Sequence, residues 1–164
     1  MSVRSARRSA AAVALLALGS AGVASAQTAS QTVTFQVNAI NVISVSGTPS
    51  LTITTAAPGS TPTSATDVTS TWAVTTNQST AKITASIPTA MPAGLTLSAN
   101  LTAPAGASSQ GLKALGTVAV DMVTNVTKVA QGSLGITYQL DATLAAGVVA
   151  SGTRLVTYTI TGGT

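Results

Sequence analysis

Three aspartates, Asp67, Asp121 and Asp141, are the only acidic residues of this 164-residue chain, which contains no glutamate, histidine or cysteine. Two carboxylates converging on a cleft could hydrolyse a glycosidic bond. Serine–histidine–aspartate catalysis, histidine general bases, histidine metal ligands and cysteine nucleophiles are all excluded. Each aspartate lies where an expected strand begins or ends, a common place for Asx turns, and no D-x-D-x-D calcium ladder is present. We therefore predict a protein that is not an enzyme, with no catalytic residue, cofactor or metal site.

The few aromatic side chains bear on ligand binding, because sugar-binding modules usually present exposed rings. Every aromatic residue here shares an apolar face with aliphatic neighbours in an alternating segment, so we predict that all of them belong to the core and form no binding platform. These residues are Phe35, Trp72, Tyr138 and Tyr158. Ile136 and Leu140, which flank Tyr138 on its face, are predicted core residues as well.

The first 26 residues have the pattern of a secretory signal peptide. Arg4, Arg7 and Arg8 precede the apolar run AAAVALLAL, and the small residues ASA stand before Gln27. The apolar run is shorter than the roughly 20 residues that a membrane-spanning helix needs. We expect cleavage of residues 1–26 and export of a single domain, residues 27–164, to the periplasm, the cell surface or the medium.

Removal of the signal peptide changes the charge balance. The whole chain has a net charge of +4, but the exported part keeps four basic residues against three aspartates, a net charge of +1. This nearly neutral chain gives no support for nucleic-acid binding. No other apolar run could span a bilayer, and the absence of cysteine excludes disulfides.

Threonine, serine, alanine, glycine and valine dominate the composition, which favours strands and turns. Apolar residues alternate with polar ones in several short segments that turn-forming stretches such as GTPS, TNQS and AQGS separate. About eight such segments predict an antiparallel two-sheet β-sandwich. The alternating positions are Val33, Phe35 and Val37; Leu51 and Ile53; Val68, Trp72 and Val74; Ile83, Ala85 and Ile87; Leu95, Leu97, Ala99 and Leu101; Val118 and Val120; Leu134, Ile136, Tyr138 and Leu140; and Val156, Tyr158 and Ile160.

Two stretches of the sequence echo each other. ITASIPTAMPAGL, from Ile83, and ITYQLDATLAAGV, from Ile136, share several residues at the same offsets. Each is typical of a strand followed by a small-residue connection. Two copies are too few for a repeat architecture, so convergent turn chemistry is favoured over duplication.

In these regions, GSLGITYQLDATLAAGVVASGTRLVTYTIT (Gly132 to Thr161) and KITASIPTAMPAGLTLSANL, the chain resembles uncharacterised secreted β-sandwich proteins of bacteria. More loosely, it resembles pilin-like and filament-forming surface subunits. The resemblance implies an Ig-like or fimbrial sandwich with a role at the cell surface. Classical chaperone-assembled pilins commonly carry a disulfide and end soon after a tyrosine, and this chain departs from both features.

These observations favour a structural or adhesive surface protein. Sheet edges are normally guarded by charges, prolines or bulges, and the first alternating segment has no lysine or arginine. Residues 27–37 either pair within their own sandwich, the simpler alternative, or add to a neighbouring molecule with Val33, Phe35 and Val37 filling its groove. A different function class, binding of a polysaccharide or protein through the loops APGSTPTSA and APAGASSQG, stays open.

Overall fold

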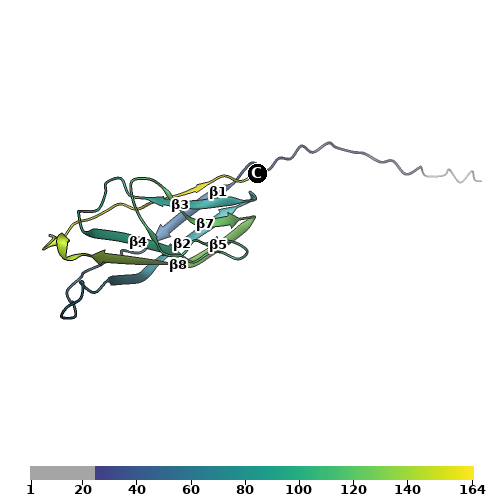
Figure 1. The fold of residues 1–164 in the computed structure, drawn as a ribbon. Helices are drawn as coiled ribbons and strands as arrows, with labels where there is room; N and C mark the ends of the chain where they lie inside the picture. Colours follow the sequence, from purple (N-terminus) through teal and green to yellow (C-terminus); the bar gives the residue numbers. More distant parts are fainter. Residues whose placement is uncertain (1–24) are drawn as a thin grey trace, which may run out of the picture. The chain divides into compact units, whose positions relative to one another are not determined.

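A computed structural model describes residues 25–164 of the chain (Figure 1). The predicted signal peptide lies outside the described residues except for Ser25 and Ala26. Every strand belongs to one compact unit, Val37–Thr164, whereas residues 25–36 belong to a separate unit and contain no strand. Within residues 25–164, no helix is long and apolar enough to cross a membrane.

The prediction of an all-β antiparallel two-sheet sandwich is confirmed. The first sheet holds, in spatial order, β1 (Asn41–Ser46), β2 (Ala65–Thr76), β8 (Val129–Ala142), β4 (Leu95–Leu101) and β6 (Lys113–Ala114). The second sheet holds β5 (Ser108–Ser109), β7 (Val120–Val126), β3 (Ala81–Ser86) and β9 (Thr157–Thr161). A single 3-10 turn, η1 (Leu144–Ala146), is the one helical segment in the described part of the chain.

The core lies between the two sheets and is built from the inward-facing residues of the long central strands. In β3 the buried residues Ala81, Ile83 and Ala85 alternate with more exposed ones, as expected for a strand with one covered face. Trp72 of β2 and Ile136 of β8 are each only 1% exposed. Burial of such large side chains is the dominant favourable contribution to folding in a chain without disulfides.

Several sequence predictions differ from the structure. No strand covers Val33 to Val37, and the first strand begins at Asn41. Leu51 and Ile53 lie outside the strands, as does Val118, which is 77% exposed in the loop before β7. Val68 does not share the buried face of Trp72, since an irregularity in the β2–β8 pairing between Asp67 and Ser70 changes the phase and leaves Val68 67% exposed.

The sheet edges differ between the two sides of the sandwich. On one side the edge strands are β5 and β6, which have two residues each. On the other side they are β1 and β9, which have six and five residues, lie close together and contain no charged residue. Short edge strands and edge charges are devices that prevent pairing with another chain. The β1/β9 side therefore lacks the protection that the β5/β6 side has.

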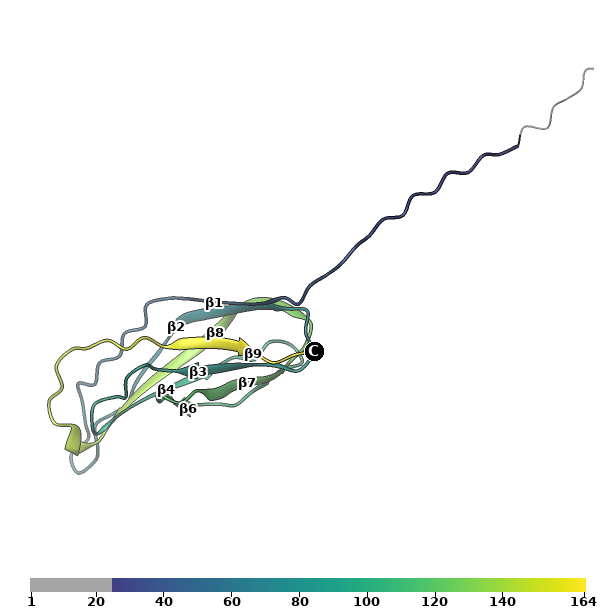
Figure 2. The same cartoon turned by 90° about the horizontal axis from the view of Figure 1, so that it is seen from above.

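The two ends of the sandwich are distinct. At what we call the proximal end, the backbones of Ser79 and the C-terminal Thr164 exchange two hydrogen bonds, of 3.0 and 3.2 Å. At the distal end lies η1, on the opposite end of the sandwich from the C-terminus (Figure 1, Figure 2). Strand β2 connects the two ends, from Ala65 to Thr76.

The two echoed sequence stretches meet at the distal end. The backbone N–H of Thr143 donates to the carbonyl oxygen of Gly94 at 2.8 Å. Gly94 has a positive φ of +79°, and a Cβ added there would lie 2.6 Å from the backbone nitrogen of Ala146. Only glycine allows this approach at position 94.

We predict that Trp72→Ala lowers the free energy of unfolding by about 3–5 kcal/mol, because it leaves a cavity between the sheets. That loss is a large part of the roughly 5–15 kcal/mol available to a typical domain. Urea unfolding followed by circular dichroism measures the change. In the parent protein the Trp72 fluorescence should be blue-shifted and shielded from iodide, and a red-shifted, freely quenched signal would contradict the described packing.

Gly94→Ala should destabilise the protein more than Gly59→Ala does. Both glycines have positive φ, +79° and +83°, so both substitutions carry the left-handed backbone penalty of about 1–2 kcal/mol. Only at Gly94 does the new methyl group also collide with the backbone of Ala146, since nothing lies within 4 Å at Gly59. Thermal unfolding of the two variants isolates the packing contribution, and equal losses would contradict it.

Candidate functional site

Each of the three aspartates makes polar contacts with partners of its own. Asp67 accepts hydrogen bonds from the backbone and hydroxyl of Thr69 and from the backbone N–H of Ser50, at 2.8–3.2 Å. The Thr69 hydrogen bonds, followed by the one from Ser50, lower the pKa of Asp67 below its ordinary value. Asp67 is thus a charged acceptor that fastens the chain after β1 to strand β2. This is the Asx-type structural role predicted from the sequence.

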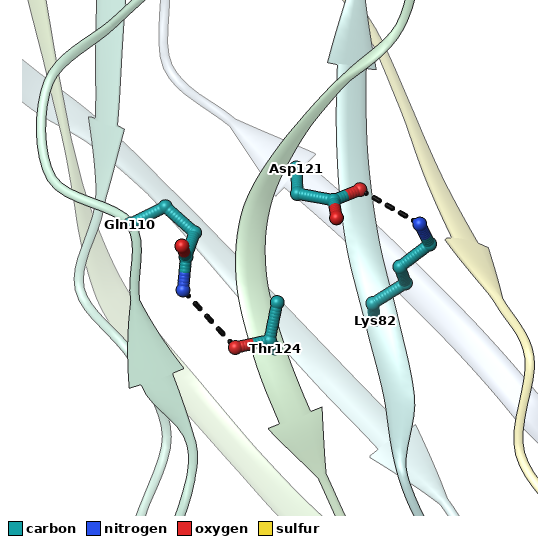
Figure 3. Close-up of polar contacts among 4 residues, drawn as sticks. All are labelled: Lys82, Gln110, Asp121 and Thr124. Atoms are coloured by element: carbon teal, nitrogen blue, oxygen red, sulfur yellow. Dashed lines mark hydrogen bonds and ion pairs between the residues drawn. The ribbon is translucent and has the colours of Figure 1, made fainter.

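The other two carboxylates lie in polar surroundings of a similar kind. Asp121 on β7 makes an ion pair of 2.9 Å with Lys82 on the neighbouring strand β3, and both side chains are nearly half exposed (Figure 3). An ion pair this exposed contributes about 0–1 kcal/mol to the free energy of unfolding. Asp141 accepts hydrogen bonds from Ser64 and from Gln139. No group of three metal-ligating side chains occurs among residues 25–164.

Figure 3 also shows a second polar contact of the smaller sheet, this one between uncharged side chains. Gln110, which follows β5, donates from Nε2 to the hydroxyl of Thr124 on β7 at 3.0 Å. The Lys82–Asp121 ion pair bridges β3 and β7 on the same sheet. These contacts link adjacent strands and do not converge on a cleft, so they are structural.

The two tyrosines link the sheets. Tyr158 of β9 donates its hydroxyl hydrogen bond to the Tyr138 hydroxyl of β8, at 2.9 Å. Burial raises the pKa of both phenols, and the donated hydrogen bond raises the pKa of Tyr158 further. Both phenols therefore stay neutral at physiological pH and cannot act as bases. Their hydrogen bond ties the edge strand β9 to the larger sheet.

The predicted core residues occupy different depths. Trp72, Ile136 and Tyr138 are 7% exposed or less, whereas Leu140 and Tyr158 are half-buried. The Trp72 indole N–H donates to the backbone carbonyl of Thr102 at 3.2 Å, so its polar group is satisfied within the protein. None of these rings forms an exposed platform.

Phe35 is the exception to the prediction that all aromatic residues are buried. It is 90% exposed, and Val33 and Val37 are 73% and 79% exposed. Alternation shows which side chains share a face, but a face is buried only where another layer covers it. We call residues 27–37 the arm. Three large apolar side chains exposed in series make the arm a candidate interaction surface.

The side chain of Asn77 fixes the chain immediately after the arm. The backbone N–H of Ile40 donates to Asn77 Oδ1 at 2.8 Å, and the Asn77 amide donates to the carbonyl of Asn38 at 2.8 Å. Asn77 follows the last residue of β2, Thr76, which pairs with Asn41. The chain that follows the arm therefore enters β1 at the proximal end.

A partly open cavity of about 610 Å³, the distal groove, lies at the other end of the sandwich. Three stretches and Pro62, which pairs with Ala56, line it. The stretches are residues 51–56 after β1, the connection from Met91 to Leu95, and the end of β8 with the chain that leads to β9. Its apolar side chains Leu51, Met91, Leu95 and Leu140 are half-buried, so they extend the core to the surface. Its volume lies within the range of known ligand sites, about 300–1,000 Å³.

Arg154 is the only charged residue that lines the distal groove. Its guanidinium donates to the backbone carbonyls of Thr153 at 2.8 Å and of Ala90 at 3.2 Å. The second bond joins the chain leading to β9 to the connection after β3. Arg154 thus fixes the shape of the groove by binding backbone, and the rest of the lining is apolar or hydroxylic.

The arm, the unprotected β1/β9 side and the distal groove are the surface features that could perform a function. Sequence analysis identified the side chains of the arm but missed the groove, whose lining comes from stretches roughly 40 to 60 residues apart. The loops APGSTPTSA and APAGASSQG contain no aromatic or acidic residue. Comparisons of the chain with protein-family models, with curated proteins and with solved structures find no match.

Proposed function

We propose that this protein is an exported, non-enzymatic β-sandwich of the bacterial cell surface, with a structural or adhesive role, whose copies associate by strand addition through the arm. The observation that carries the proposal is the exposure of Val33, Phe35 and Val37 in one extended, alternating segment. Such alternation fits a strand that buries one face against a partner. The Ig-like or fimbrial character and the secretory export belong to the same proposal.

A rough energy comparison indicates what the association requires. Complete burial of one valine or phenylalanine side chain stabilises by about 1.5–3 kcal/mol. Three such side chains together are of the same order as the roughly 4–15 kcal/mol that association costs in lost freedom. Side-chain burial alone is therefore marginal. Backbone pairing at an unprotected edge must add to it, and the β1/β9 side supplies such an edge.

The alternative function is that of a binding module for a polysaccharide or a protein. The volume and the apolar lining of the distal groove favour it, because both are typical of ligand sites. Binding of purified protein to a panel of polysaccharides tests this alternative. A ligand that protects the groove in a protein that stays monomeric would favour it over self-association.

Phe35→Asp should prevent assembly without unfolding the sandwich, because Phe35 is 90% exposed and lies outside the strands. Val118→Asp is the matched control, since Val118 is also an exposed apolar residue, at 77%, but lies in the sandwich. Size-exclusion chromatography with light scattering and electron microscopy of both proteins measure assembly. Equal assembly by the two variants would rule out the arm as its cause.

Deletion of residues 27–37 distinguishes the two roles of the arm. All nine strands lie after residue 40, so we expect the shortened protein to keep its unfolding temperature and to lose assembly. A peptide with the sequence QTVTFQV should bind to it. Global unfolding of the deletion variant would show instead that the arm belongs to its own sandwich.

A further inference from the structure

The geometry points to the distal groove as the acceptor for the arm of a second copy. We infer that Phe35 of one molecule enters this groove beside the β1/β9 edges of the next. The inference rests on the proposed self-association and adds to it the place where the arm binds. The occupant is a second copy of this chain.

The lining of the groove matches the chemistry of the arm. Leu51, Met91, Leu95 and Leu140 offer half-buried apolar surface, and the arm offers the exposed side chains of Val33, Phe35 and Val37. The arm, residues 27–37, contains no charged residue. The one cation that lines the groove, Arg154, donates to two backbone carbonyls at its rim, and the rest of the lining is uncharged like the arm.

The position of the groove also matches the unprotected edges. Residues 51–56 continue the chain from β1, and Val149 to Arg154 lead into β9, yet neither stretch forms a strand in the larger or the smaller sheet. The distal groove is thus the place where the β1/β9 side of the sandwich is not closed by paired strands. A strand entering here can bury its apolar face on the core and can pair with backbone groups along an edge.

A limit on chain length excludes the molecule's own Phe35 as the occupant. Ile40 is fixed at the proximal end by Asn77. Phe35 precedes it by five residues, which span at most about 18 Å when fully extended. The groove begins near Asp67, nine residues along β2 from Thr76, which corresponds to about 30 Å. Phe35 of the same chain therefore cannot reach the groove.

Because the arm leaves from the proximal end and the acceptor lies at the distal end, the contact joins two different surfaces. Such a heterologous contact repeats from molecule to molecule and gives open-ended filaments unless the rotation closes a ring. Two molecules that exchange arms reciprocally would instead close a two-fold dimer through the same contact. We propose the open arrangement, in which the arm of each molecule enters the groove of the next and growth is head to tail.

Chemical cross-linking tests the acceptor directly, because the chain contains no cysteine and introduced ones are unique. Isotopically labelled full chain carrying Thr34→Cys, which keeps Phe35, is mixed with unlabelled chain carrying Ser151→Cys, a conservative change in the groove lining. Ser108→Cys, on the exposed edge strand β5, is the matched control. A short bis-maleimide reagent joins thiols that lie close together, and mass spectrometry identifies the joined peptides.

We expect cross-links between residues 34 and 151 of different chains, several-fold more abundant than those between residues 34 and 108. Light scattering on the same samples separates the ways in which the inference can fail. Monomers without cross-links between chains would overturn both the proposed self-association and the acceptor. Polymers whose cross-links favour residue 108, or show no preference, would exclude the groove as the acceptor and leave the proposed self-association intact. A cross-link between residues 34 and 151 within one chain, in a protein carrying both substitutions, would overturn the second copy as the occupant.

Discussion

The packing of two sheets against each other is the interaction on which the rest of this structure depends. The chain has no disulfide and only one ion pair in its described part, between half-exposed side chains, so burial of apolar surface must stabilise the fold. Trp72 and Ile136 from the larger sheet, with Ile83 and Met122 from the smaller one, are fully buried. The strands of both sheets, with the loops that connect them, are positioned by this buried core.

The edge strands differ between the two sides of the sandwich. Two-residue strands terminate the β5/β6 side, and pairing there has little length to propagate. On the β1/β9 side the edge strands are longer and uncharged. The Tyr138–Tyr158 hydrogen bond joins β9 of the smaller sheet to β8 of the larger one. Beyond these strands the distal groove exposes part of the core. One unprotected side, together with an exposed apolar arm, gives this protein the surfaces that head-to-tail association requires.

Much of the fold follows from local patterns in the sequence. Alternation predicted β3 and β8 well, because each has one face that is more buried than the other. Alternation failed to predict burial where the face of a segment is covered, or left open, by distant parts of the chain. Val68 is exposed because the β2–β8 pairing is irregular beside it, and Phe35 is exposed because no strand forms in its segment. The groove was not predictable at all, since its lining requires the topology to bring residues near 51, 91 and 150 together.

The central claim is that copies of this protein join through two different surfaces, arm and groove. Sedimentation velocity of the unmodified protein over a wide concentration range tests it most directly. Open head-to-tail contacts predict a broad series of species that shifts to larger sizes as the concentration rises, up to the size of a closed ring where the rotation closes one. A single monomeric species at every concentration, or a dimer at which growth stops, would contradict the account.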